Sequence, residues 1–189
     1  MRTKLYIAAV MAGLFIFGQG VHAFSGNGSK MPHHFGGNSL VVGSDGTSYV
    51  ASANIASATS MTSMTSNLIA ITSAGSKQSI TVNGLVKKFV IGQDTSSNNY
   101  LIATAMVKSS TTTSPSTVLY ITPLPFSQSS TPTSVSLTGA MASRPQIVNG
   151  NIYITTTLWS ASTTGGASTK TSYLNVVGFN GSIVSQVSY

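Results

Sequence analysis

The sequence predicts an all-β fold made of three repeated units, each with four short antiparallel strands. Three observations favour this fold class. Runs rich in Val, Ile, Leu, Tyr and Thr alternate with turn residues such as Gly, Asn, Asp and Ser. Similar runs recur at a period of about 50 residues. No stretch after the first 23 residues keeps a helical apolar period over three turns.

The first recurring run contains a tyrosine. Tyr49, Tyr100 and Tyr153 lie in LVVGSDGTSYVAS, FVIGQDTSSNNYLIAT and QIVNGNIYITT, and they are 51 and 53 residues apart. In each run the tyrosine follows a turn and begins an apolar stretch. We therefore expect it to lie in the second strand of each unit.

Two further runs follow each tyrosine at similar distances. SNLIAITSAGS, STVLYITPLPFS and SYLNVVGFNGS have Leu68, Val118 and Leu174 as landmarks, at spacings of 50 and 56. QSITVNG, TSVSLTG and GSIVSQVSY come next, and Gly84 and Gly139 are 55 residues apart. Three landmarks with nearly the same period indicate a repeat rather than chance similarity.

The repeat divides residues 38–189 into units of approximately 38–86, 87–141 and 142–189. In the first unit we expect strands at Ser39–Gly43, Ser48–Ala53, Leu68–Thr72 and Ser79–Val82. Residues 24–37 precede the repeats as a flexible lead-in, because they are rich in Gly, Ser and Asn.

The run LVVGSDGTSYVAS followed by NLIAITSAGS resembles the blades of quinoprotein-like (PQQ-type) β-propellers. In those repeats an apolar strand, Asp-Gly-Thr, a Tyr-Val strand and a Leu-x-Ala-Ile strand follow one another. The resemblance implies propeller blades over about residues 38–189. It implies no cofactor, because no position matches the calcium ligands or the carboxylate base of the quinone enzymes. The blade tryptophan of that family is also missing, since Trp159 stands in an expected loop.

Three blades leave the closure of such a ring open. A propeller closes with about 4–8 blades, and an open stack exposes strands that can pair. Two chains could complete a six-bladed ring as a homodimer. A partner protein could supply the missing blades, or the units could form a β-sandwich or a short β-solenoid.

Residues 1–23 are expected to be a signal peptide. Arg2 and Lys4 precede the apolar run YIAAVMAGLFIFG, and Val21-His22-Ala23 places small residues at a cleavage site after Ala23. The chain has no cysteine, so neither a lipoprotein anchor nor a disulfide framework is possible. The protein is therefore expected to be exported, to the periplasm, the cell surface or the medium, with no membrane span after cleavage.

Charge and composition exclude some function classes. From Phe24 onward seven basic residues face only Asp45 and Asp94, a formal charge of +5. Nucleic-acid-binding proteins carry denser and more patterned Lys and Arg, so we do not expect that class. A hydroxyl-rich surface with few charges provides little repulsion against self-association.

The acidic residues are expected to be turn residues. Asp45-Gly46 between two apolar strands favours a type I′ hairpin turn, and Asp94 lies in the matching turn of the second unit. The third unit has Asn149-Gly150 there, with no acid. A calcium loop needs several closely spaced oxygen ligands, which are absent.

No catalytic or metal site is expected. His33 and His34 lie in the lead-in, and no Cys and few carboxylates exist to complete a metal site around them. No nucleophile elbow, phosphate loop or carboxylate pair suited to glycoside hydrolysis occurs. We therefore predict a protein that is not an enzyme and needs no cofactor.

One pattern points to an interaction face. The long connections between second and third strands should lie at one end of each unit, with the connections between units. Both aspartates should lie at the other end. The expected face at the first end comprises Lys87, Lys88, Lys108, Arg144, Trp159 and Lys170, with Lys108, Trp159 and Lys170 in the long loops.

These observations predict an exported, non-enzymatic interaction or scaffold module. The expected partner is another protein, a second copy of the chain or an anionic envelope polymer. The alternative is a structural subunit that assembles edge to edge into a fibre or a surface layer, favoured by low charge and open strand edges.

Overall fold

The computed structural model describes residues 40–54, 63–108, 115–160 and 168–189. All of them belong to one unit of the chain, Gly36–Tyr189. The predicted signal peptide, the lead-in and the central parts of the three long connections lie outside the described residues. The described residues contain no helix that could cross a membrane.

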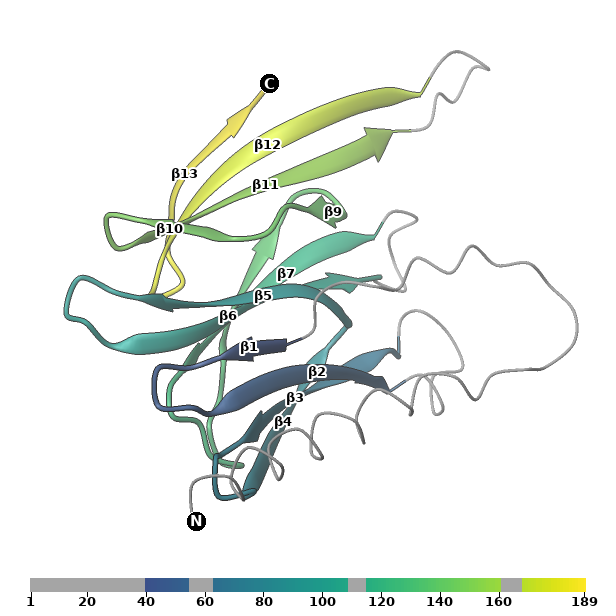
Figure 1. Ribbon diagram of the computed structural model, residues 1–189. Coiled ribbons are helices and arrows are strands. Elements are labelled where there is room, and N and C mark those ends of the chain that lie inside the picture. Colours follow the sequence, from purple (N-terminus) through teal and green to yellow (C-terminus); the bar gives the residue numbers. More distant parts are fainter. Residues whose placement is uncertain (1–39, 55–62, 109–114, 161–167) are drawn as a thin grey trace, which may run out of the picture. The chain divides into compact units, whose positions relative to one another are not determined.

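The described residues form thirteen β-strands in three sheets (Figure 1). Sheet A contains β1 (Leu40–Val42), β2 (Ser48–Asn54), β3 (Thr65–Ile71) and β4 (Lys77–Asn83). Sheet B contains β5 (Leu85–Gln93), β6 (Asn99–Val107), β7 (Ser116–Pro123) and β8 (Thr133–Leu137). Sheet C contains β9 (Met141–Ala142), β10 (Gln146–Val148), β11 (Asn151–Ser160), β12 (Thr169–Gly178) and β13 (Ile183–Ser188).

Every strand pair in these sheets is antiparallel, and strands adjacent in sequence are adjacent in the sheet, except that β9 pairs with β11. The predicted all-β class with antiparallel four-stranded units is therefore confirmed, and sheet C has one additional short strand. The four strands expected for the first unit overlap β1, β2, β3 and β4.

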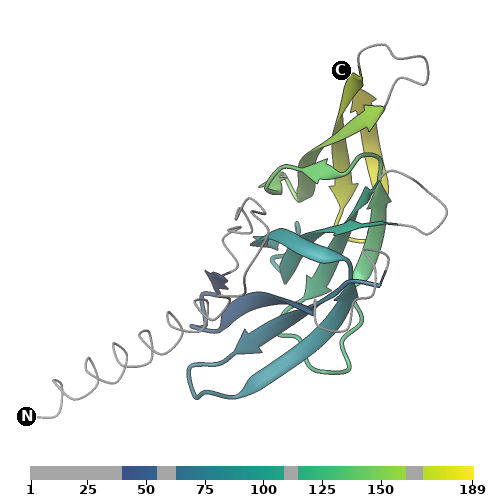
Figure 2. The same ribbon diagram turned by 90° about the vertical axis from the view of Figure 1, so that its right-hand side faces the viewer.

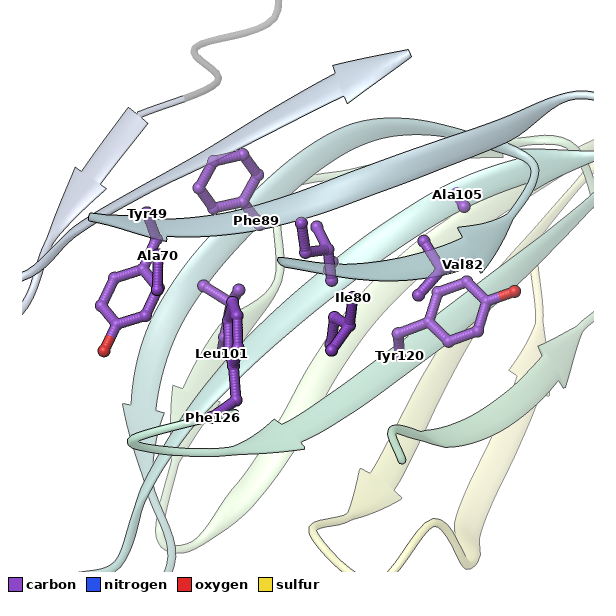
Figure 3. Close-up of a cluster of buried hydrophobic side chains, with 11 residues drawn as sticks. Tyr49, Ala70, Ile80, Val82, Phe89, Leu101, Ala105, Tyr120 and Phe126 are labelled. Carbon is purple, nitrogen blue, oxygen red and sulfur yellow. The ribbon is translucent and has the colours of Figure 1, made fainter. Parts of the chain in front are cut away.

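Sheets A and B pack through an apolar cluster. Side chains that alternate along the strands of each sheet point towards the other sheet (Figure 3). Sheet A contributes Tyr49, Leu68, Ala70, Ile80 and Val82, and sheet B contributes Phe89, Leu101, Ala103, Ala105 and Tyr120, with Phe126 after β7. The period-2 pattern of each strand therefore buries one face of sheet A.

The opposite face of sheet B packs against sheet C, so both faces of sheet B are covered. Both views place sheet B between the other two sheets (Figures 1 and 2). The second cluster joins Val90, Ile102, Leu119, Ile121, Val135 and Leu137 of sheet B to Ile152, Ile154, Val177 and Phe179 of the sheet C region. The central strands β6 and β7 of sheet B are accordingly buried along most of their length, because their alternate residues face two different neighbours.

The three tyrosines hold the same place in the three sheets. Tyr49 pairs across the sheet with Ala70, and Tyr100 pairs with Pro123. Tyr153 pairs with Val176. Each pair joins the second strand of a four-stranded path to the third, near the turn that follows the first strand.

This register corrects one landmark of the sequence alignment. Leu68 and Leu174 pair with residues two positions after their tyrosines. In sheet B that place belongs to Ile121, which pairs with Ile102, and not to Val118. Val118 is not the equivalent residue, because the third run of the second unit has more residues between this position and the turn than the third runs of the other two units.

Gly84 and Gly139 follow the last strands of sheets A and B and lead into the next sheet. Both have positive φ, 86° and 93°. A Cβ on Gly84 would lie 2.6 Å from the carbonyl oxygen of Met106, and one on Gly139 would lie 2.7 Å from the backbone of Thr157. Only glycine combines that dihedral angle with so close an approach to the neighbouring strand.

The turn at Asp45 differs from its prediction. Of Asp45 and Gly46 only Gly46 has positive φ, 79°, so the turn is not type I′. The Gly43 amide donates to the Thr47 carbonyl at 2.8 Å, and the Gly46 amide donates to the Gly43 carbonyl at 3.0 Å. These bonds define a three-residue loop with a type I turn and a G1 bulge.

The hairpin of sheet C does have the type I′ pattern. Asn149 and Gly150 have φ of 49° and 70°, and their neighbours Val148 and Asn151 pair directly. The equivalent hairpins of sheets A and C therefore use two turn types. The difference is the loop length, since a two-residue loop needs positive φ at both positions.

Candidate functional site

Three residues of the expected interaction face lie at one end of sheet B. A register shift in β5 inserts Lys87 between Val86 and Lys88 as an extra residue. Lys88 pairs with Thr104 of β6, and Lys108 directly follows that strand. The bulge and the strand end therefore bring three cations to the same end of one sheet.

Two of these lysines border a hollow of about 220 Å³. Burial lowers the pKa of Lys87, and Lys88 donates from Nζ to the Ala142 carbonyl at 3.4 Å. Met106 and Thr117 also line the hollow. No described residue forms a hydrogen bond with the buried Thr117 hydroxyl. The hollow thus combines alkyl walls with two amines and one unsatisfied hydroxyl.

Trp159 and Lys170 lie at the corresponding end of sheet C. Both were expected in a loop, but β11 and β12 extend far enough to include them as directly paired residues. The Lys170 ammonium lies 6.0 Å from the centre of the Trp159 ring, within the range of a cation–π contact. The indole is 52% exposed, so the pair forms a surface feature and not part of the core.

Arg144 lines a different hollow from Lys87 and Lys88, although it is only two residues after Ala142, which accepts a hydrogen bond from Lys88. It lies between β9 and β10 and lines a second, open cavity of about 590 Å³. The other walls come from β1, β5 and β10, which contribute Val41, Val90 and Ile147 among others. The arginine therefore belongs to the region where the three first strands approach one another.

Both aspartates lie in turns that follow the first strand of a sheet. Asp45 accepts hydrogen bonds from the Thr47 amide at 3.0 Å and from its hydroxyl at 2.8 Å. The backbone bond from Thr47 is the main cause that lowers the pKa of Asp45, followed by the hydroxyl bond.

Asp94 has more partners. It accepts from the amides of Ser96 and Asn98 at 2.8 and 2.9 Å, and from the Asn98 side chain at 2.9 Å. The Tyr100 hydroxyl donates to it at 3.2 Å. The Asn98 side-chain bond is the largest of the causes that lower the pKa of Asp94. Both carboxylates are therefore engaged in holding turns.

No metal site emerges from the described ranges, in which no three His, Cys, Asp or Glu side chains come together. His33 and His34 lie outside the described residues.

The sequence did not reveal that sheets A and C each keep an open apolar face. Among the described residues, nothing packs on the side of sheet A that bears Leu40 and Val42, which are 53% and 59% exposed. On sheet C the open side bears Val187 and Tyr189, 54% and 73% exposed. Alternation along the strands predicts which residues share a face, but not which face remains uncovered.

Comparison of the chain with family models, with curated proteins and with solved structures finds no match. The likeness to quinoprotein-like propellers therefore stays a prediction that rests on the quoted runs.

Proposed function

We propose that the protein is an exported, non-enzymatic β-repeat module with propeller-like sheets, and that its lysine end binds an anionic polymer of the cell envelope. The lysine end comprises Lys87, Lys88, Lys108 and Lys170 with Trp159. The observation that carries this proposal is the position of these groups at the ends of β5, β6, β11 and β12.

The charge distribution supports an anionic partner. The carboxylates of Asp45 and Asp94 lie in the turns at the opposite ends of their sheets, so they do not neutralise the lysines locally. Cations at the ends of the strands attract polyanions, and salt screens that attraction over about 8–10 Å at moderate ionic strength. The exposed indole of Trp159 adds a flat apolar surface beside Lys170.

The export step of the proposal rests on the basic start, the apolar run and the small residues before Ala23. The propeller-like architecture rests on three successive antiparallel meanders that place a tyrosine at the same register position. The binding role is supported by the sequence, which contains no nucleophile elbow, phosphate loop or suitable carboxylate pair.

The binding proposal is tested with alginate as the anionic polymer and dextran as the neutral one. The purified protein should bind alginate at low salt, lose affinity as salt rises, and ignore dextran. Replacement of Lys87, Lys88, Lys108 and Lys170 by Gln should abolish binding, whereas Lys77→Gln should not. Equal binding by the quadruple variant at every salt concentration would overturn the proposal.

A second candidate function is a structural subunit that assembles into a fibre or surface layer. The apolar faces of sheets A and C that no described residue covers favour it, because every copy of the chain carries both. Electron microscopy at rising protein concentration tests this candidate. Filaments that lengthen with concentration would support it, and particles of one fixed size would exclude it.

A further inference from the structure

Each of the two contacts between adjacent sheets contains one tyrosine–phenylalanine pair. Tyr49 of sheet A packs on Phe126 of the sheet B region, with ring centres 5.7 Å apart and planes tilted by 56°. Tyr100 of sheet B packs on Phe179 of the sheet C region, at 4.8 Å and 48°. In both contacts the tyrosine comes from the earlier sheet and the phenylalanine from the later one.

The phenylalanines hold equivalent positions as well. Phe126 lies three residues after Pro123, the partner of Tyr100. Phe179 lies three residues after Val176, the partner of Tyr153. The two sheet contacts therefore use residues at equivalent positions of the strands. In each contact, one face of the earlier sheet meets the opposite face of the later sheet.

Sheet C presents the face that would meet a following sheet, but no described residue packs there. Tyr153 shares this face with Leu174, Val176, Val187 and Tyr189, according to the cross-strand pairs. The equivalent residues of sheet A are Tyr49, Leu68, Ala70, Ile80 and Val82, all buried against sheet B. The open face of sheet C thus has an apolar side chain at each of these five positions, whereas Gln146 and Thr155 take the places of Val41 and Ala51.

Sheet A presents the face that would meet a preceding sheet. Its apolar members are Leu40, Val42, Val50, Ile69 and Ile71, which are joined by cross-strand pairs. Val50 directly follows Tyr49, as Ile154 follows Tyr153, and Ile154 is buried against sheet B. The two open faces of one chain are therefore the two halves of a sheet contact that the chain already makes twice.

We propose that the open face of sheet C docks onto the open face of sheet A in a second copy of the chain, and that the two copies do this reciprocally. Both halves of the contact occur on every copy, so a second copy supplies what each face lacks. A two-fold axis then closes the pair. The resulting six sheets fall within the 4–8 blades at which sheet rings close.

The charges on the two faces permit this contact. Lys77 is on the open face of sheet A at the turn before β4, and Lys170 is on the open face of sheet C near its hairpin with β11. The turn before β4 and the β11–β12 hairpin lie at opposite ends of their sheets. Docking in the register of the internal contacts therefore keeps the two ammonium groups apart.

One difference from the internal contacts provides a sensitive test. Ser73 is three residues after Ala70, the partner of Tyr49, so it occupies the place of Phe126 and Phe179. Tyr153 of a docked copy would find no ring there. Ser73→Phe should supply it in both contacts of the pair and tighten pairing by up to about a hundredfold, about tenfold for each aromatic pair.

Sedimentation of the purified protein over a range of concentrations measures the pairing. The expected result is a discrete dimer for the natural chain and a tighter dimer for Ser73→Phe. Ser96→Phe, which adds a ring to an exposed turn of sheet B, should leave the dissociation constant unchanged. A monomer at all concentrations for the natural chain and for Ser73→Phe would overturn the proposal.

Two aspartate variants test which faces meet. Val187→Asp on sheet C and Val42→Asp on sheet A should each weaken pairing by at least about tenfold, because the contact would bury an unpaired carboxylate. Ser136→Asp adds the same charge to β8 and should have no effect. Val42 and Val187 are more than half exposed, so thermal unfolding of the monomers should be nearly unchanged.

Mixing the variants distinguishes the reciprocal arrangement from others. In a mixed pair of Val187→Asp and Val42→Asp chains, one contact carries both changes and the other carries none. The mixture should therefore recover heterodimers that neither variant forms alone. If one variant alone still dimerises, the pair uses one face twice and the proposal is wrong. A ladder of larger species would overturn the closed pair.

Lys170 belongs both to the lysine end and to the open face of sheet C, so the two proposals are separated with the triple variant of Lys87, Lys88 and Lys108. The triple Lys→Gln variant should still dimerise, and the Val187→Asp monomer should still bind alginate. Either proposal can thus fail without the other.

Discussion

The two sheet contacts of the molecule use the same register but treat one buried position differently. In the A–B contact that position is Thr122, and in the B–C contact it is Asn175. The two positions are equivalent, because Thr122 pairs with the residue after Tyr100 and Asn175 pairs with the residue after Tyr153. Both side chains are completely buried. No described residue forms a hydrogen bond with the Thr122 hydroxyl.

Asn175 has a full set of partners instead. Its Nδ2 donates to the Ile154 carbonyl at 3.2 Å and to the Thr156 hydroxyl at 3.1 Å. Its Oδ1 accepts from the Gln186 side chain at 2.6 Å. The same register position therefore holds a buried polar residue in both contacts. Only the hydrogen bonds around Asn175 compensate the loss of contact with water that burial of a polar group causes.

The largest expected effects come from the apolar cores of the two contacts. Leu101 and Ile102 are adjacent in β6, fully buried, and face sheets A and C respectively. Each change to Ala should lower the free energy of unfolding by about 2–5 kcal/mol, because it removes buried methyl groups and leaves a cavity.

Urea unfolding measures these losses, and hydrogen exchange of β3 and β12 amides shows where they act. Similar losses with global exposure would mean that the two contacts unfold as one unit. Faster exchange of β12 alone in the Ile102→Ala variant would instead mean that sheet C opens separately.

The change Asn175→Leu tests the polar network. Leucine keeps the branched skeleton of asparagine, although it is larger, and the Gln186 amide and the Thr156 hydroxyl lose a partner inside the protein. We expect a loss of about 1–3 kcal/mol in unfolding free energy, measured by urea titration. An unchanged midpoint would show that the network does not stabilise the B–C contact.

The change Thr122→Val is the counterpart at the matched position of the A–B contact. Valine has nearly the shape of threonine and removes a buried hydroxyl that no described residue satisfies. The urea midpoint should rise, by about 1 kcal/mol of unfolding free energy, with an unchanged slope. A destabilised Thr122→Val variant would reveal a partner of this hydroxyl and weaken the contrast with Asn175.

The smallest effect concerns pH, through the turn that supports Tyr100. Hydrogen bonds lower the folded-state pKa of Asp94, so its ionised form stabilises the protein above the ordinary carboxyl range. That stability should be lost as the pH falls through the lowered pKa.

Urea midpoints between neutral and acidic pH measure this dependence. The Asp94→Asn variant should be less stable than the natural chain at neutral pH and should lose less on acidification. Asp45→Asn is the control variant for the other aspartate. The Asp45 carboxylate accepts hydrogen bonds from Thr47 within its own turn, whereas the Asp94 carboxylate also accepts a hydrogen bond from Tyr100. An identical pH dependence of Asp94→Asn and the natural chain would contradict the prediction.

Several elements could be predicted from local sequence. Tyr49, Tyr100 and Tyr153 identify the second strands because an apolar run follows a turn in each case, and local propensity is enough to detect that. Gly84 and Gly139 mark the passages between sheets because only glycine accepts their backbone geometry.

Other features depended on context that a single run does not contain. The Ser and Thr residues around Trp159 and Lys170 predict a loop, yet both residues are paired in strands. Asp45-Gly46 predicts a type I′ turn, whereas the backbone bonds of Gly43 and Gly46 close a three-residue loop. Turn type and strand ends depend on the pairing of whole hairpins, which tertiary packing extends or shortens.

By itself, the sequence determined the class of fold and the number of antiparallel units, because period-2 alternation and turn residues act within a few positions of one another. Only the tertiary structure decided which faces are buried. Leu68 and Leu174 stand at equivalent positions, but one is completely buried between sheets and the other lies on an open face. Alternation specifies that a residue faces a side of its sheet, and burial requires a second sheet on that side.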